Sequence, residues 1–375
     1  MGSINEFCFA AGCLPVPALV QRYGSSRVYL IGILLLAVGL LGDAFADSLE
    51  VWFLTHGVLV GTGMAVVFMT AFDLVYKHTP KSYRGLCVGT SFAGGGCGAA
   101  VLSLLLTLSV SVRGLSATML VLMIASCCYT MAILSLVMAL VRWGHHFVDL
   151  PAGRSSSSKP SVPDSVCSCC PTSVRWFTDR NFLLFLTAMV LYLFGFSVPY
   201  NHLPQHAEDQ GVPEAQAAGL LSVMGICNAV GRISFAYLGD RAGGAYLGIF
   251  TVTVFVASLL MFLLPHCGSY WSLSVFAASY GLFAGGRVGL TSLVCCELFG
   301  QNNVSNTYSL LGLAFMFSQT LGSPVVGRVH DASGSYMFGF LLTSVLMAAA
   351  FLVLLLLVVL VRVGERDDLH CSNTV

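Results

Sequence analysis

The sequence predicts an all-α integral membrane protein, on two observations. Of its 375 residues, 57% are hydrophobic and only 9% are charged, with a mean hydropathy of +0.85. Soluble domains carry about a quarter charged residues, so this chain could not cover a surface that faces water. The hydrophobic residues also gather into runs long enough to cross a bilayer. The formal net charge is zero, which provides no basic field for nucleic acid.

The apolar runs give the expected helices in order. A bilayer core about 30 Å thick needs about 20 apolar residues per helix. Eleven runs meet this length, at approximately residues 3–20, 28–46, 51–75, 86–108, 115–141, 182–200, 217–238, 246–264, 271–296, 307–328 and 336–361. The first run lacks the basic start of a signal peptide and carries Glu6 early, so we expect it to be retained.

A polar stretch rich in Ser and Pro separates five runs from six. It predicts an N-terminal helical half at 1–141, a cytoplasmic central loop at 142–181, a C-terminal helical half at 182–361 and a cytoplasmic tail at 362–375. Loop charges set the orientation. With the loop after the first run in the cytoplasm, thirteen of the seventeen Lys and Arg residues lie inside and only Arg113 and Arg328 outside. The C-terminus is therefore expected inside and Met1 outside.

Two short loops are alike and stand six runs apart. Gln21-Arg22-Tyr23-Gly24 follows the first run, and Asp240-Arg241-Ala242-Gly243 follows the seventh. Either loop alone is also compatible with an ordinary positively charged cytoplasmic turn. Their spacing indicates a parallel repeat of six helices. In each loop we expect an Arg that caps a neighbouring helix or pairs with an acid, and so latches one conformation.

Both loops resemble the loop after helices two and eight of the major facilitator superfamily. This resemblance implies a bundle of six plus six helices, with eleven of the twelve present and the first one missing. It also assigns Arg22, Gly24, Asp240 and Arg241 to a gating latch at the cytoplasmic side.

Three segments resemble the monocarboxylate transporter family more specifically. They are 84–98 with Arg84, Gly89, Ala93, Gly94 and Gly98; 196–240 with Val198-Pro199-Tyr200, His202-Leu203 and Gly231-Arg232-Ile233; and 280–331 with Glu297-Leu298-Phe299-Gly300 and Gly322-Ser323-Pro324. The second segment looks like the branch of the family that is not dedicated to lactate. In the first, the family's paired basic residues are reduced to Arg84, with Lys81 nearby, and Arg84 joins the expected latch.

The resemblance implies a plasma-membrane solute carrier that moves a small organic carboxylate or zwitterion by alternating access. It implies a single-span ancillary glycoprotein as a partner, and no enzymatic activity, cofactor or metal. The alternative is a truncated, non-transporting variant that acts as a partner or regulator, because the first helix normally lines the cavity.

Arg232 is the first candidate for substrate binding. A charged residue inside a span is rare, and it costs at least about 2.5–3.5 kcal/mol on the insertion scale. Asn228 lies one turn earlier, and we expect Ser222 to continue that face. The resemblance implies that Arg232 contacts the substrate anion, and that proton-coupled relatives hold an aspartate where Asn228 stands. Because asparagine cannot titrate, we expect no proton coupling by this route. The alternatives are that Arg232 snorkels to the cytoplasmic surface and that Asn228 only bonds a neighbouring helix.

Arg287 is the second candidate. It lies near the middle of its run, among small residues, and no acid lies deep in the last six runs. Two arginines in one half would favour an anion. The alternative is that Arg287 pairs with a helix-end carbonyl or with an acid of the N-terminal half.

Other polar residues give weaker signals. His202 and His206 are expected in the outer loop after the run 182–200, with His202 either at the outer mouth or solvated. Asp73 is expected to pair with Lys77 four residues later, and Asp43 to be interfacial.

The clustered cysteines in the central loop are compatible with palmitoylation or with inert thiols. They are Cys167, Cys169 and Cys170. The sequon Asn303-Val304-Ser305 falls on the cytoplasmic side, so we expect no glycan there.

Overall fold

The computed structural model describes residues 2–45, 48–80, 83–94 and 174–372. Across these ranges the chain is helical and contains no strand, which confirms the all-α prediction. Eight candidate membrane spans coincide with eight of the eleven expected runs: Ser25–Asp43, Glu50–Tyr76, Arg180–Asp209, Gln216–Arg241, Tyr246–His266, Tyr270–Phe299, Gln301–Ser333 and Met337–Gly364. The run 115–141, most of 86–108 and nearly all of the central loop lie outside the described residues.

The first run is not one continuous helix. It forms α1 (Gly2–Cys13) and α2 (Val16–Tyr23), with the break at Leu14 and Pro15. Proline has no N–H to donate and its ring clashes with the preceding turn, and Pro17 then occupies the first turn of α2, where proline is well tolerated.

The described remainder of the N-terminal half contains two candidate spans and a further helical segment. The first span is α3 (Ser25–Ala44). The second combines α4 (Leu49–Trp52), the π-helix η1 (Phe53–Val60) and α5 (Gly61–His78), which follow one another without a break. The further helical segment comprises residues 84–94. A π-helical stretch within a span is uncommon and often accompanies a functional site.

The C-terminal half contains six spans. Its elements are η3 (Val174–Thr178), α8 (Arg180–Phe196), α9 (Val198–Asp209), α10 (Glu214–Arg241), α11 (Tyr246–Leu263), η4 (Leu264–His266), α12 (Tyr270–Phe299), η5 (Gln301–Asn303), α13 (Val304–Ser333) and α14 (Met337–Ser372). Side chains cap two of the helices: Asp179 accepts from two amides at the start of α8, and Ser269 forms a capping box with Ser272 at the start of α12.

Two predicted boundaries differ from the structure. Residues expected in an outer loop form α9, because Pro199 in its first turn supplies a helical φ and needs no N–H partner there. The polar tail continues α14 as far as Ser372.

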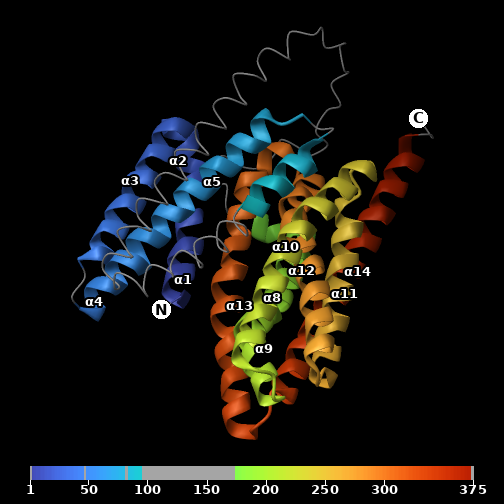
Figure 1. Cartoon of the computed structure of the whole chain (residues 1–375). Coiled ribbons are helices and arrows are strands. Elements are labelled where there is room, and N and C mark those ends of the chain that lie inside the picture. The colour runs from blue at the N-terminus through green and yellow to red at the C-terminus, as the bar shows by residue number, and fades with distance from the viewer. Residues whose placement is uncertain (1, 46–47, 81–82, 95–173, 373–375) are drawn as a thin grey trace.

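The helices form two groups (Figure 1), with α1 to α5 on one side and α8 to α14 on the other. The N-terminal part of α1 and the ends at α4 and α9 lie at one end of the bundle, and α2 and the C-terminus lie at the other. We call the end with α2 the inner end and the end with α4 and α9 the outer end. These two names follow the orientation that the loop charges predict.

Helices α10 and α12 pack unusually closely because glycines line their contact. Three glycines of α12, spaced four residues apart, face three carbonyl oxygens of α10 that have the same spacing. A methyl group on any of them would lie 2.1–2.6 Å from such an oxygen, the pairs being Gly281 with Met224, Gly285 with Asn228 and Gly289 with Arg232. Since carbon and oxygen cannot approach so closely, only glycine fits, and this packing fixes the backbone that carries Asn228 and Arg232.

Candidate functional site: a polar centre between the two halves

Asn228 and Arg232 form a continuous hydrogen-bonded chain with two other residues. Asn228 Nδ2 donates to the Tyr200 hydroxyl at 2.9 Å, and Arg232 Nε donates to Asn228 Oδ1 at 2.8 Å. Arg232 Nη1 also donates to the Phe92 carbonyl oxygen at 2.6 Å. Phe92 belongs to segment 84–94, so the guanidinium joins the two halves. In this conformation Arg232 therefore points to the interface between the halves and does not snorkel to the surface.

The asparagine at 228 suits both of its contacts. Its amide nitrogen donates to Tyr200 while its amide oxygen accepts from Arg232. An ionised aspartate would accept from both partners, so the tyrosine would have to become the donor. The sequence indicated that Asn228 and Arg232 are neighbours, but the roles of Tyr200 and Phe92 were missed. Tyr200 was quoted only as part of a family motif.

Arg287 lies in the deepest part of α12. At 1.5 Å per residue it is about 25 Å from the start of the helix and about 18 Å from its end, too far for its side chain to reach either surface. It is 1% exposed, and Nε, Nη1 and Nη2 have no hydrogen-bond partner among the described residues. The surroundings are aromatic, with the guanidinium 5.0 Å from the ring of Tyr192, 4.7 Å from Phe196 and 5.9 Å from Phe315.

These rings offset some of the cost of burying Arg287. A desolvated cation–π contact contributes about 2 kcal/mol, whereas burying an ion costs several kcal/mol after relaxation. The structure supports neither of the pairings considered for Arg287: no ion pair in the described ranges involves it, and no carbonyl accepts from it. Tyr200 lies within electrostatic reach of both Arg287 and Arg232, so the two cations act on one region.

Ser222 is not brought to this centre. It is exposed while Asn228 is buried, because six residues turn a helix by about 600°, which leaves Ser222 about 120° round from Asn228. Its role as a substrate contact stays a prediction.

The inner end is closed by Asp240 at the end of α10. Its carboxylate accepts from the backbone N–H groups of Gly85 and Leu86 at 2.8 and 2.9 Å, and from the Tyr246 hydroxyl at 2.8 Å. The two amides begin segment 84–94, where unpaired N–H groups and the helix dipole favour a negative charge. A methyl group on Gly85 would lie 2.3 Å from the Ala236 carbonyl oxygen, so this contact also depends on glycine.

A second set of contacts closes the inner end beside α13. Ser305 donates to the Asp73 carboxylate at 3.0 Å, and Gln301 Nε2 donates to the Tyr76 carbonyl at 3.4 Å. Asp73 therefore joins the halves; the side chain of Lys77, its expected partner, lies outside the described residues. These residues border a polar cavity of about 230 Å³ between α2, α5 and the start of α13.

Of the three arginines expected in the latch, only Arg84 lies between the halves. It is 7% exposed, and it lies 5.7 Å from the Tyr76 ring with Nη1 3.5 Å from Cys296 Sγ. Arg22 stacks on Tyr23, and Arg241 bonds Tyr237 in its own helix. Within the described ranges neither of these two forms a hydrogen bond or an ion pair with the opposite half.

The glycines of the repeated loops adopt the turn that the repeat suggests. Gly24 and Gly243 both have positive φ, at 83° and 71°, a conformation that is open to glycine at little cost.

Three histidines of α9 and α13 lie near one another at the outer end. His202 Nε2 lies 3.1 Å from the Ser323 carbonyl oxygen, and its ring lies 5.4 Å from that of Tyr336. His206 is buried against Phe340, and His330 stacks on Tyr336 at 4.0 Å. The expectation of a loop for His202 and His206 was wrong. His202 links two helices of the C-terminal half, and its role at the outer mouth stays a prediction.

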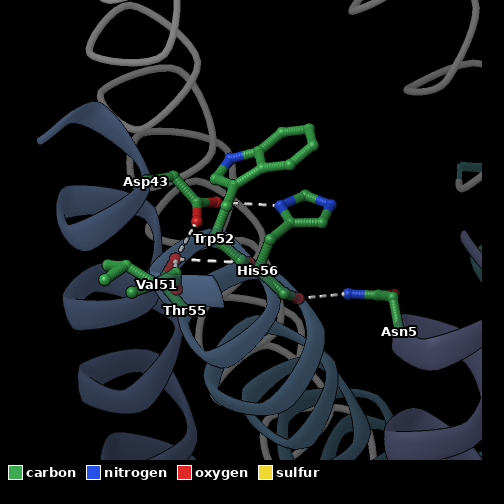
Figure 2. Close-up of polar contacts among 6 residues, drawn as sticks. All are labelled: Asn5, Asp43, Val51, Trp52, Thr55 and His56. Carbon is green, nitrogen blue, oxygen red and sulfur yellow. Dashed lines mark hydrogen bonds and ion pairs between the residues drawn. The ribbon is translucent and has the colours of Figure 1, made fainter. Parts of the chain in front are cut away.

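Asp43 lies at the end of α3, and its side chain is fully buried within the protein. Figure 2 shows its carboxylate between Thr55, which donates to it, and His56, whose Nδ1 lies 2.8 Å away. The His56 ring stacks on Trp52, and its carbonyl accepts from Asn5 Nδ2 of α1 at 2.7 Å. This cluster, which the sequence did not reveal, ties α3 and η1 to α1.

The predicted cysteine group at 167–170 lies outside the described residues. No cluster of three or more metal-binding side chains occurs in the described part of the chain.

Comparison with known proteins gives consistent matches. Residues 1–305 match the sequence model of the Major Facilitator Superfamily. The chain is 25% identical over 371 residues to monocarboxylate transporter 12 of Xenopus laevis, covering 96% of this chain and 80% of that protein. It is 27% identical over 355 residues to human monocarboxylate transporter 10, covering 92% of this chain and 66% of that protein. Among solved structures, the fucose:proton symporter FucP of E. coli superposes with a TM-score of 0.68 at 17% identity, covering 95% of this chain and 90% of that one.

Proposed function

Because the chain belongs to the Major Facilitator Superfamily, we propose that it is a carrier that moves a small organic carboxylate or zwitterion by alternating access. Its similarity to monocarboxylate transporters 10 and 12 supports this substrate class. The protein does not couple transport to protons through α10, since Asn228 replaces a titratable carboxyl group.

The observation that carries this proposal is the position of the two arginines. Arg232 lies at the interface between the halves, and Arg287 is buried in the C-terminal half with no acidic partner among the described residues. A positive centre inside a bundle of membrane-spanning helices favours an organic anion over a cation or a neutral sugar. Asn228 orients Arg232, and Ser222 is proposed to border the same path.

The contacts between the halves are suited to a reversible gate. Asp240 and Asp73 hold the inner end through hydrogen bonds that water can replace, and Arg232 adds one bond nearer the centre. Opening the inner end breaks these contacts and leaves each half intact, as rigid-body alternating access requires.

We further propose that the carrier lies in the plasma membrane with a cytoplasmic C-terminus, and that a single-span ancillary glycoprotein accompanies it. The loop charges support the orientation, and the family resemblance supports the location and the partner. The carrier has no enzymatic activity of its own.

Uptake of radiolabelled monocarboxylates into cells that lack endogenous carriers tests the proposal. We expect wild-type uptake above background and a loss of at least about tenfold in Arg232→Ala, because charge-assisted bonds contribute about 1.5–3 kcal/mol. Arg362→Ala, at an exposed position of α14, is the control and should match wild type. Equal uptake by wild type and Arg232→Ala would refute the site, and no wild-type uptake of any monocarboxylate would refute the carrier.

A further inference from the structure

We propose that the ring of Tyr308 closes the inner path between the two halves, and that a bound substrate carboxylate opens this path by taking Arg232 away from the Phe92 carbonyl. This inference rests on the carrier function proposed above and identifies the gate of that carrier. It assigns the closure to aromatic rings and their release to the substrate.

Four aromatic rings meet where α13 packs against the N-terminal half. We call them the aromatic gate: Phe68 and Phe72 of α5, Phe92 of segment 84–94, and Tyr308 of α13. The three phenylalanine rings lie 5.6–6.4 Å from one another. The Tyr308 ring stacks on Phe72 at 4.9 Å and lies 6.3 and 6.4 Å from the other two rings. Tyr308 therefore extends from the C-terminal half into a cluster that belongs to the N-terminal half.

The aromatic gate lies between the polar centre and the inner cavity. Ser305, which bonds Asp73 beside the cavity, precedes Tyr308 by three residues, so Tyr308 lies about 4.5 Å deeper along α13. On the other side of the gate, Tyr308 is within electrostatic reach of Arg232, and Phe92 contributes the carbonyl to which Arg232 donates. A substrate that leaves Arg232 toward the inner end therefore has to pass these rings.

The rings exclude water, which the polar contacts at the inner end do not. The hydrogen bonds of Asp73 and Asp240 can be exchanged for hydrogen bonds to water, whereas an apolar constriction blocks water and ions by dewetting. Phe72 is buried, and Tyr308 packs against both hydrophobic clusters of the described residues. When the halves separate at the inner end, Tyr308 moves with α13 while the three phenylalanines stay together, so the withdrawal of one ring opens the path.

Phe92 connects the gate to the substrate site. Its ring belongs to the gate, and its carbonyl oxygen accepts from Arg232 Nη1 at 2.6 Å. A carboxylate adds a negative charge and a second oxygen, so it binds a guanidinium more strongly than a neutral carbonyl does. A substrate carboxylate at Arg232 therefore replaces the Phe92 carbonyl as the acceptor of Nη1, and the bond that holds segment 84–94 against α10 is lost. Without substrate, the carbonyl occupies the arginine and the inner end stays closed.

Maleimide labelling of Cys296 in inside-out vesicles tests the gate without any substrate. Cys296 lies beside Arg84 at the inner end and becomes accessible when the halves separate. Tyr308→Leu keeps an apolar side chain but removes ring contacts, each of which changes an equilibrium by about two- to twelvefold. We expect it to label at least about fivefold faster than wild type, and Phe72→Leu, which removes the closest ring of the other half, to do the same. Tyr308→Phe keeps the ring and should label at the wild-type rate.

The matched control removes a ring contact that lies within the C-terminal half. Phe255 of α11 lies 4.7 Å from Phe351 of α14, so Phe255→Leu loses a similar contact and should label like wild type. Melting curves of the same proteins show whether each variant is folded. If Tyr308→Leu is not folded, Phe72→Leu decides the test.

A second experiment tests the release by substrate. Acetate, pyruvate and phenylacetate are added on both sides of the vesicles, with phenylacetamide as the uncharged analogue of phenylacetate. We expect at least one carboxylate to speed the labelling of Cys296 in wild type severalfold, and phenylacetamide to have no such effect. Arg232→Met lacks the bond to Phe92, so it should label about tenfold faster than wild type without substrate, and the carboxylates should not speed it further.

Several results would overturn the assignment. The gate is refuted by wild-type labelling rates in Tyr308→Leu and Phe72→Leu, or by an equal acceleration in Phe255→Leu or Tyr308→Phe. The release by substrate is refuted if no carboxylate speeds the labelling of wild type, or if Arg232→Met labels slowly or keeps the response. Failure of the carrier function is a separate result, because it appears as absent uptake by wild-type protein in cells, whereas the labelling of the gate variants needs no transport.

Discussion

Tyr200 and Asn228 show how one hydroxyl can hold an arginine in place. Tyr200→Phe removes the acceptor of the buried Asn228 amide, which frees that side chain to turn and release Arg232. We expect a loss of about 1–3 kcal/mol in stability, because a buried donor is left unsatisfied, and lower uptake. Tyr237→Phe removes an exposed tyrosine–arginine bond and should change both by little. Melting curves and uptake of the two variants make the comparison; equal effects would argue against the proposed role of Tyr200.

The pair of Asp43 and His56 allows a second test with single residues. His56→Ala leaves the buried Asp43 carboxylate with Thr55 as its remaining side-chain partner, and we expect a loss of about 1–3 kcal/mol. Replacing both residues by Ala should cost less than the sum of the two single changes, because no unpaired buried charge remains. A double-mutant cycle of melting temperatures measures this difference. Strictly additive losses would mean that the two side chains do not interact.

Helices α10 and α12 act as one unit because glycines remove the space between them. Gly285→Ala would put a methyl group 2.1 Å from the Asn228 carbonyl oxygen, so the helices must separate and carry Asn228 away from Tyr200. We expect a loss of about 1–3 kcal/mol, as for other overpacked contacts, together with reduced uptake.

The control for Gly285→Ala is the substitution of a glycine of α10, the helix that Gly285 packs against. A methyl group on Gly219 meets nothing within 4 Å among the described residues, so Gly219→Ala should be neutral or should stabilise by up to about 1 kcal/mol through helix propensity. Melting temperatures and uptake of both variants compare the two positions. If Gly285→Ala behaved like Gly219→Ala, the close packing would not determine the site.

The sequence predicts those features that depend on local pattern. Apolar runs predict the spans, and the four-residue spacing of Asn228 and Arg232 predicts that their side chains meet on one helix face. Features that join distant segments were not predictable: the cage around Arg287 combines α8, α12 and α13, and the bond from Arg232 to Phe92 crosses 140 residues. The same limit applies to the side-chain partners of Asp43, since they depend on how η1 packs against α3.

The two halves meet at the inner end through an acid of one half and the first amides of a helix in the other. Asp240→Ala removes the charge that accepts from Gly85 and Leu86. A charge at a helix N-terminus contributes up to about 2 kcal/mol. Its loss should therefore shift the balance toward an open inner end by about five- to thirtyfold for a change of about 1–2 kcal/mol.

Cys296 reports this opening, because it lies at the inner end of α12 beside Arg84. In inside-out vesicles a maleimide should label Cys296 faster in Asp240→Ala than in wild type, as measured by mass spectrometry of the labelled peptide. Arg241→Ala, next in sequence, should leave the labelling rate unchanged, since the side-chain hydrogen bond of Arg241 within the described residues is to Tyr237 of its own helix. Faster labelling in Arg241→Ala alone would assign the latch to the arginine of the repeated loop and not to the aspartate.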